Sequence, residues 1–543
     1  MTGDVQKTAG SLSFFWVAAV FLFLLSFLYC FTVWRIFPYG IVQGDTGTYL
    51  NLTYNFHIFQ FNPEDWARTI PFGWLLRFGL LFPNPTGAVF LACAVLSSIN
   101  FALLFWMTLG LVRSLRVAFL FSLLVLVWEI VSGHVILQSL LMLADPLFGH
   151  LVLTGSLLIL GGWMHKKPAA QIIGYAVLGI AAFVKPAGVA LFPVWALFAF
   201  FSFGKDLKHF RVPRQWKMLC IFLLLLAGPN LFWSGRNFFI YGSFKPTAYG
   251  GLNFIERVLP LVKDSDSILD DPAKNTAFIR SLRTFEQKVG TGYNEYMWGS
   301  KPGLPSPWRW LEQDLQKSVY GNRDLTAYEN IKMFFMLDPI LNRVSLNIIR
   351  QHPLAYAKMF LTDYNMLFAP VSAWGGDIIW LQVPARDFYP PIFADYDATQ
   401  RSTYFPPDGK PNLTQSDEPA RHVIARFSDT LRVVLWLKKW QPVFQLPAIH
   451  ILFLISIVFL WWKKKSNGAQ RDSINLTHVA VCIAMFSATA ISLNVLTSMV
   501  ELGLARYALP AEMPMDIILL LAPFLVVLWI VERIRTLQFL RKD

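Results

Sequence analysis

Apolar stretches close to the length that a bilayer requires recur along this chain of 543 residues, from Ser11 to Val531. A helix needs about 20 consecutive apolar residues to cross the hydrocarbon core of a membrane. The composition agrees, because 55% of the residues are hydrophobic and 15% are charged, outside the usual range of soluble globular domains. The sequence therefore predicts an all-α polytopic membrane protein.

The apolar runs predict about ten membrane-spanning helices. The first run lacks a small-residue cleavage site, so we expect it to remain as a spanning helix and not to be removed as a signal peptide. Cys30, Cys93, Cys220 and Cys482 all lie inside apolar runs, and we expect no disulfide. The predicted spans cover residues 11–36, 87–112, 117–133, 146–164, 170–185, 187–204, 218–234, 446–462, 475–497 and 513–531.

Basic residues mark one side of the predicted bundle. Short loops that are rich in Lys and Arg face the cytoplasm. The formal net charge of +13 resides largely in such loops, which argues against a nucleic-acid-binding patch. We therefore expect a multi-pass protein of the bacterial inner membrane with both termini in the cytoplasm. The loops contain Arg113 and Arg116, Lys166 and Lys167, five basic residues between Lys205 and Lys217, Lys463 to Lys465, and Arg533 and Arg535.

The stretch 243–442 separates two groups of predicted spans and is rich in Pro, Gly, Asp, Trp and Tyr. Amphipathic segments over 327–350 and 354–368 predict helices that rest on the membrane surface. We expect a mixed, largely helical extracytoplasmic domain here, and the number of membrane-associated helices within 327–372 stays open. The predicted division is an N-terminal transmembrane module (1–242), the extracytoplasmic domain (243–442) and C-terminal transmembrane helices (443–543).

Two carboxylates fall on the predicted extracytoplasmic side and are candidate catalytic residues. Asp45 stands among Gly and Thr residues, in a turn that would present its carboxylate to solvent or substrate; a plain turn ahead of a surface helix is the alternative. Asp145 precedes Pro146 at the start of a predicted span. A helix N-cap followed by a first-turn proline has the same appearance, so capping is the alternative for this residue.

Cations from three further segments fall on the same side. Lys185 interrupts an apolar pair of spans, and the pairs Arg236-Asn237 and Arg506-Tyr507 flank others. Each could be an interfacial anchor. Their location on the same side as two carboxylates favours a catalytic site over separate anchors. Glycosyl transfer from a lipid phosphate needs a base for the acceptor and cations for the departing phosphate, and these residues include a carboxylate for the first role and cations for the second.

Short motifs, in a common order along most of the chain, carry a resemblance to a known family. They are the Asp45 loop with Tyr49 following, Arg68-Thr-Ile-Pro71, Ala144-Asp145-Pro146-Leu147-Phe148, Lys185-Pro186, Arg236-Asn237 leading into Gly250-Gly251-Leu-Asn253, and Arg506-Tyr507 with Pro510 and Pro514. With these motifs the chain resembles the GT-C glycosyltransferases. The resemblance is to the bacterial branch that includes the lipid A aminoarabinose transferase and, more distantly, to the protein O-mannosyltransferases.

The resemblance implies a GT-C-like fold, a polyprenyl-phosphate-linked sugar donor, use of the extracytoplasmic face and Asp45 as the carboxylate at the catalytic centre. One departure is Asp145, since the family often has Glu at this place. Some members hold a divalent cation beside the first-loop carboxylate and others do not. The sequence has no dense carboxylate cluster, so we assign no metal ligand and leave Mg²⁺ or Mn²⁺ open.

The resulting hypothesis is a single displacement that inverts the anomeric carbon, with Asp45 as base. The acceptor is an envelope glycan, lipid or protein, and the sugar is not identified. Candidate phosphate ligands are Lys185, Arg236, Arg506 and, more weakly, Arg68, and candidate positioning residues are Tyr49, Asn237 and Tyr507.

Three alternatives stay open at this point. The first is a transporter or flippase of a lipid-linked substrate, against which stand the absence of an internal duplication and the location of the charges near one face. The second is a glycan polymerase or ligase that uses a lipid-diphosphate donor. The third is a nonenzymatic assembly subunit with the same fold.

Overall fold

The computed structural model of the chain is almost entirely helical in the residues that it describes. These are residues 2–36, 49, 60, 69–79, 81–82, 85–112, 114–131, 144–203, 213–289, 326–367, 445–462, 475–500 and 509–540. Two short 3-10 turns, η1 (Pro186–Ala190) and η2 (Leu259–Leu261), adjoin α-helices, and no strand occurs within these ranges. The all-α prediction is therefore confirmed for this part of the chain.

Seven helices in the described ranges are long and apolar enough to cross a membrane, which identifies a membrane protein. The other three predicted spans also lie on helices, but α5 (Leu115–Val131) and α8 (Pro168–Val184) have 17 residues each and α9 (Leu191–Phe203) has 13. These are shorter than the roughly 20 residues of a typical crossing. The seven are α1 (Thr2–Ile36), α4 (Pro85–Val112), α7 (Ala144–Met164), α10 (Pro213–Tyr241), the helix 445–462, α21 (Leu476–Val500) and α22 (Leu509–Leu540).

The predicted end of the span 218–234 was wrong. We expected a span to end at residue 234 and an external loop to follow, but α10 continues to Tyr241. It ends where Gly242 adopts a φ of +74°, a conformation that glycine adopts without steric cost, and the Gly242 N–H donates to the Phe238 carbonyl (2.9 Å). Arg236 therefore lies in the last turns of a candidate span and not in a loop.

Close packing at glycines fixes α8 between α7 and α10. A Cβ added to Gly174 of α8 would lie 2.8 Å from the Gly155 carbonyl oxygen of α7. A Cβ added to Gly179 would lie 2.0 Å from the Leu225 carbonyl oxygen of α10. Small residues allow helices in a membrane to approach this closely. The end of α8 is therefore held in place against both neighbours. Cys30, Cys93, Cys220 and Cys482 lie within the helices, and none of the four forms a disulfide.

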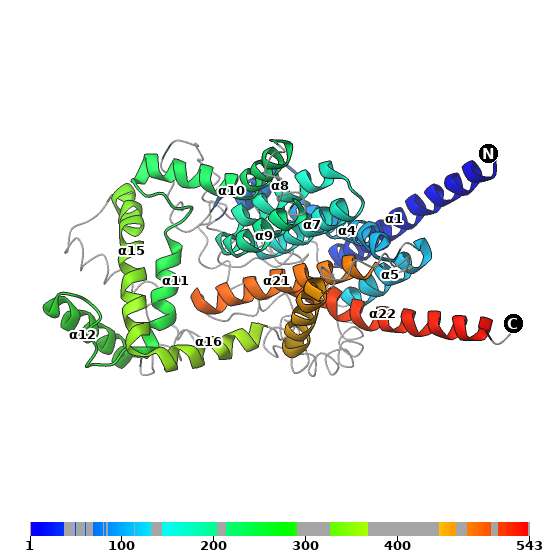
Figure 1. The fold of residues 1–543 in the computed structure, drawn as a ribbon. Helices are drawn as coiled ribbons and strands as arrows, with labels where there is room; N and C mark the ends of the chain where they lie inside the picture. Colours follow the sequence, from blue (N-terminus) through cyan, green and yellow to red (C-terminus); the bar gives the residue numbers. More distant parts are fainter. Residues whose placement is uncertain are drawn as a thin grey trace.

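A separate group of helices lies at one end of the molecule, and both chain termini lie at the opposite end (Figure 1). α11 (Tyr249–Val258) and α15 (Ala327–Gln351) lie side by side and share a hydrophobic core with η2 and α12 (Pro272–Val289). We call α11, η2, α12 and α15 the cap. α16 (Pro353–Leu367) leads from the cap back along α21 (Figure 1). The predicted amphipathic helices over 327–350 and 354–368 thus correspond to α15 and α16.

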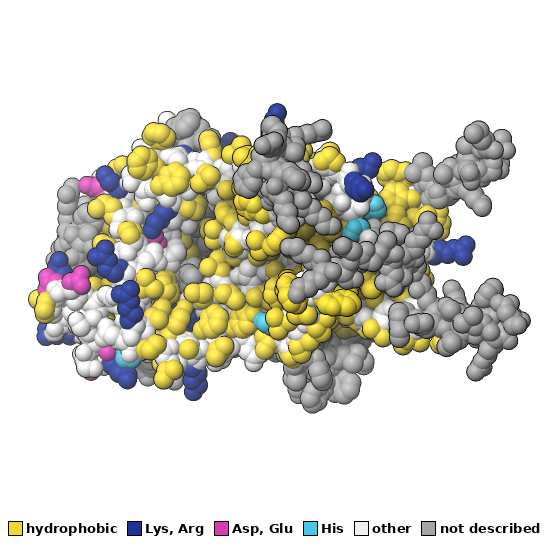
Figure 2. Space-filling model, in the orientation of Figure 1, with side chains coloured by type: hydrophobic (Ala, Val, Ile, Leu, Met, Phe, Trp, Pro, Cys, Tyr) yellow, Lys and Arg dark blue, Asp and Glu magenta, His cyan; other side chains and the backbone are white. Residues whose placement is uncertain are grey.

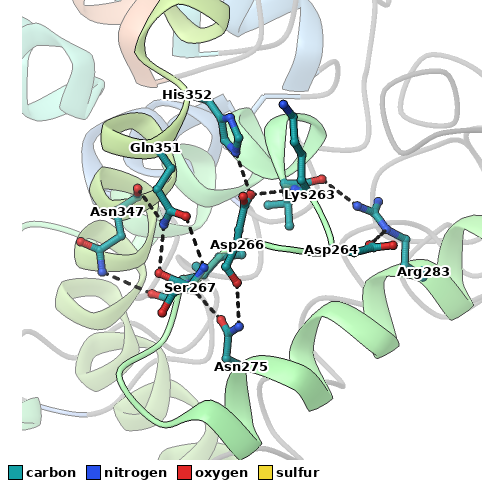
Figure 3. A network of polar contacts seen from close by, with 11 residues as sticks. Lys263, Asp264, Asp266, Ser267, Asn275, Arg283, Asn347, Gln351 and His352 are labelled. Atoms are coloured by element: carbon teal, nitrogen blue, oxygen red, sulfur yellow. Dashed lines mark hydrogen bonds and ion pairs between the residues drawn. The ribbon is translucent and has the colours of Figure 1, made fainter.

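A polar network fixes the loop between η2 and α12 (Figure 3). The carboxylate of Asp266 accepts from the Lys263 backbone N–H and contacts His352 Nε2, both at 2.7 Å. Asn275 of α12 donates to the Asp266 carbonyl (2.7 Å), and Gln351 at the end of α15 donates to the Ser267 carbonyl (2.9 Å). The loop is therefore tied to both α12 and α15.

Candidate functional site

Lys185 lies in a break between α8 and η1 that the following proline explains. Pro186 has no N–H and disfavours a helical conformation in the residue before it, so α8 ends at Val184 and Lys185 is extended (φ −134°, ψ 121°). Its ammonium group donates to Oδ1 of Asp145, at the start of α7. Two of the five segments that the sequence singled out are thus joined.

Asp145 and Lys185 are both shielded from solvent, with side chains 9% and 12% exposed. α7 begins at Ala144, so Asp145 lies within the first turn of the helix and is not the N-cap residue of the capping alternative. A lysine that serves only as an interfacial anchor extends its ammonium group into water. The buried ion pair therefore argues against the anchor explanation for Lys185.

Arg236 and Asn237 lie together near the end of α10, and both are buried. Arg236 is 2% exposed, Nη1 donates to Asn237 Oδ1 (2.9 Å), and Nη2 donates to the Gln60 carbonyl (2.5 Å). The guanidinium carbon also lies 4.6 Å from the centre of the Trp233 ring, in a cation–π contact. An exposed anchor would have none of this burial, so Arg236 is part of the protein interior.

A small aromatic cluster connects the Lys185 and Arg236 segments. The rings of Trp233 and Phe183 are 5.4 Å apart, and Ile70 of α3 (Ile70–Gly79) completes a buried cluster with them. Thr69, just before α3, donates to the Phe183 carbonyl (2.5 Å) and lies 3.2 Å from the Val184 carbonyl. The hydroxyl thereby satisfies carbonyl groups that the end of α8 leaves without helical partners.

Asn237 also connects this region to the cap. Its Nδ2 donates to the carbonyl groups of Lys245 (2.9 Å) and Pro246 (3.0 Å). The Lys245 ammonium group pairs with buried Asp338 of α15, whose other oxygen accepts from the Gly251 N–H (2.5 Å). A continuous chain of hydrogen bonds and one ion pair therefore runs from Arg236 to α15.

Tyr49 is the other predicted site residue within the described part of the chain. Tyr49 is buried, and its ring meets Phe72 of α3 edge-on, with centroids 5.0 Å apart. Asp45, Arg68, Arg506 and Tyr507 lie outside the described residues. The structure thus brings together Asp145, Lys185, Arg236 and Asn237, and leaves the position of Asp45 relative to them as a prediction.

Three buried carboxylates at the same end of the bundle were not singled out from the sequence. Glu129 lies at the end of α5, and Glu512 and Asp516 lie one turn apart at the start of α22; all three are almost fully buried. Trp128 Nε1 donates to Asp516 Oδ2 (3.1 Å), which joins the two helices. Ionisable residues inside apolar runs are costly and often functional, and this signal was present in the sequence.

The described residues contain no group of three or more His, Cys, Asp or Glu side chains that could hold a metal ion. The site contains two cations, buried Arg236 and the largely shielded Lys185, each in contact with protein acceptors at the end of the spans that faces the cap. No family model, no curated protein and no solved structure matches the chain.

Proposed function

We propose that the protein is a membrane glycosyltransferase of the GT-C type that transfers a sugar from a polyprenyl-phosphate donor to an envelope glycan, lipid or protein. The supporting observation is that Lys185, just after α8, and Arg236, in α10, are shielded from solvent at the cap end of the spans and joined through the Phe183–Trp233 contact. Buried cations at the end of membrane spans suit a substrate with a lipid anchor and a phosphate group. They would stabilise the negative charge that grows on the departing phosphate.

The proposed reaction is one displacement. The acceptor oxygen forms a bond to the anomeric carbon while the bond from that carbon to the phosphate oxygen breaks, and Asp45 takes the acceptor proton. The lipid phosphate leaves with the electron pair, beside Lys185 and Arg236. Since Asp145 already pairs with Lys185, we infer that Asp145 orients the Lys185 ammonium group and is not itself the base.

The proposed topology follows the distribution of basic loops. α5, α8 and α9 would cross with the seven longer helices, which gives ten crossings and both termini in the cytoplasm. The cap end then faces the outside of the bacterial inner membrane. Arg68, Arg506, Tyr49 and Tyr507 keep their predicted roles as phosphate ligands and positioning residues, and a divalent cation stays an open alternative.

The direct test is the release of sugar-free polyprenyl phosphate. The purified protein in lipid nanodiscs is incubated with a panel of polyprenyl-phosphate sugars and a membrane extract as acceptor, and the lipid products are measured by mass spectrometry. We expect release with one donor, a loss of about 10²- to 10⁴-fold in Asp45→Asn, and no loss in Lys274→Gln, which changes an exposed cation of α12.

Two outcomes would contradict the proposal and favour the alternatives. Transfer of a whole glycan from a lipid diphosphate, with no reaction of any lipid monophosphate, would point to a polymerase or ligase. Movement of an intact lipid-linked sugar between leaflets without release of phosphate would point to a transporter or flippase.

A further inference from the structure

Both ends of α15 are tied to the ends of membrane spans. Near its start, the Tyr328 hydroxyl donates to the carbonyl of Ile240, in the last turn of the candidate span of α10 (3.0 Å). Just after its end, the Tyr356 hydroxyl of α16 donates to the carbonyl of Met499, the last residue of the α21 span (2.8 Å). α15 is about 38 Å long at 1.5 Å per residue. It therefore lies between the ends of two candidate spans.

One face of α15 combines cations with exposed apolar side chains. Lys332, Arg343 and Arg350 are exposed and fall almost on one line along the helix, because their spacings of 11 and 7 residues are close to whole turns. Apolar residues flank this line, and they remain about half exposed. They are Met336 (52%), Ile340 (50%) and Leu346 (46%). We call these six residues the α15 stripe.

Acidic residues do not neutralise the α15 stripe within the described part of the chain. Asp338 is buried on the opposite side of the helix, where it accepts from Lys245 and Gly251. Glu329 is engaged in the capping box with Thr326 at the start of α15. No ion pair is found among the described residues for the three cations of the stripe.

The stripe continues onto α16 with the same character. Leu354 and Leu361 are exposed there, and Lys358 lies one turn after Leu354 on an exposed position. Figure 2 shows dark-blue Lys and Arg side chains among hydrophobic ones over the part of the molecule that Figure 1 assigns to α15. A helix with cations and apolar residues at the membrane boundary is typical of contact with lipid headgroups, and each cation adds to the attraction of anionic lipid.

We propose that the α15 stripe binds the headgroups of anionic phospholipids at the bilayer surface, with Lys332, Arg343 and Arg350 on the phosphates and Met336, Ile340 and Leu346 inserted between the lipids. The position of α15 across two span ends favours lipid over a soluble partner. The stripe is distinct from the Lys185–Arg236 region, and the proposal does not depend on glycosyl transfer.

The test compares lipid affinities of the full-length protein in detergent by native mass spectrometry, with phosphatidylglycerol and phosphatidylcholine of equal chain length. The variant Lys332→Gln/Arg343→Gln/Arg350→Gln removes three cations from the stripe. The matched control, Lys263→Gln/Lys274→Gln/Arg280→Gln, removes three exposed cations from elsewhere in the cap. A cation near a membrane surface contributes about fivefold in affinity.

We expect the wild type to prefer phosphatidylglycerol, the stripe variant to lose at least tenfold of that affinity, and phosphatidylcholine binding to change little. The control should keep the preference. The charge-conserving variant Lys332→Arg/Arg343→Lys/Arg350→Lys should restore it, which separates lost charge from misfolding. Equal losses in the stripe variant and the control, equal loss of both lipids, or stronger stripe-dependent binding of soluble glycerol phosphate or an acidic polysaccharide would overturn the proposal.

Discussion

The ammonium group of Lys185 donates to the carboxylate of Asp145 across the contact between the end of α8 and the start of α7. The two residues are 40 positions apart, and each is nearly buried. Because the charge of each side chain is compensated by the other, neither position can be changed alone without leaving a charge in a poorly solvated place. The pair therefore stabilises the packing of the end of α8 against the start of α7.

The effects of single substitutions in this pair on the free energy of unfolding should not add up to the effect of the double substitution. Asp145→Leu and Lys185→Met should each lower the free energy of unfolding, by about 3–5 kcal/mol where the partner charge stays buried. The double variant should lose less than the sum, because it leaves no charge behind. Chemical denaturation in detergent measures all three, and additive losses would show that the two side chains do not interact in the folded protein.

Asn237→Asp should weaken the joint between α10 and the cap. The substitution keeps the shape of the side chain but removes the Nδ2 group, which donates hydrogen bonds to the carbonyls of Lys245 and Pro246. A buried carbonyl without a donor costs about 1–3 kcal/mol. We expect a lower unfolding temperature and faster hydrogen exchange at the start of α11. Asn365→Asp, at an exposed position of α16, is the control and should leave both unchanged.

Gly179→Ala should separate α8 from α10. The added methyl group would stand 2.0 Å from the Leu225 carbonyl oxygen, so one helix must move, at a cost of about 1–3 kcal/mol. Gly228→Ala on α10 is the matched control, since its nearest neighbour would be a flexible leucine at 3.9 Å. Alanine there should be neutral or stabilising. Equal unfolding temperatures for the two variants would contradict the close approach of these helices.

The cap should lose stability as the pH rises toward 8. Burial raises the pKa of the Glu256 carboxyl from 4.5 to about 8, because the charged form is poorly solvated there. Between pH 4.5 and about 8 the folded protein keeps a proton that the unfolded chain has lost, so the free energy of unfolding falls, by up to about 3 kcal/mol at pH 7. Below pH 4.5 both states carry the proton and the loss vanishes.

Glu256→Gln should remove this pH dependence, since the amide resembles the protonated acid in shape and carries no charge. The measurement is the free energy of unfolding of wild type and variant at pH 5 and pH 8, with Asp270→Asn as an exposed control. We expect the two proteins to differ most at pH 8. Parallel losses in wild type and Gln variant would mean that another group is responsible.

Local patterns in the sequence were enough to predict most of the helices and several residues of the candidate site. The apolar runs located the helices, the amphipathic spacing located α15 and α16, and the unusual charges pointed to Asp145, Lys185, Arg236 and Asn237. Tertiary contacts have no such local signature. The link from Asn237 through Lys245 to Asp338 joins residues about a hundred positions apart, and no pattern within either segment indicates that the two meet. Glu129, Glu512 and Asp516 were missed because long apolar neighbours dominate the runs that contain them.

The ends of the helices were harder to predict from the sequence than their existence. α5, α8 and α9 were expected to be spans on composition, which does not reveal where a helix ends. Pro186 ends α8, and the sequence contains that proline, but the angle at which the chain continues depends on the packing of Gly188 against Ala182. Such close backbone contacts between helices are properties of the assembled bundle and not of any segment.

The hydrogen bonds of Tyr328 and Tyr356 limit how the cap can move. A lid turns about a hinge at one edge, but α15 is fastened to α10 near its start and, through Tyr356 of the adjoining α16, to α21 just beyond its end. The cap must therefore follow the relative tilt of these two spans. Spans tilt when the bilayer becomes thinner than their apolar length. A change in membrane thickness would therefore move α15. Through the Asp338–Lys245 ion pair, it would also move the segment that contains Arg236 and Asn237.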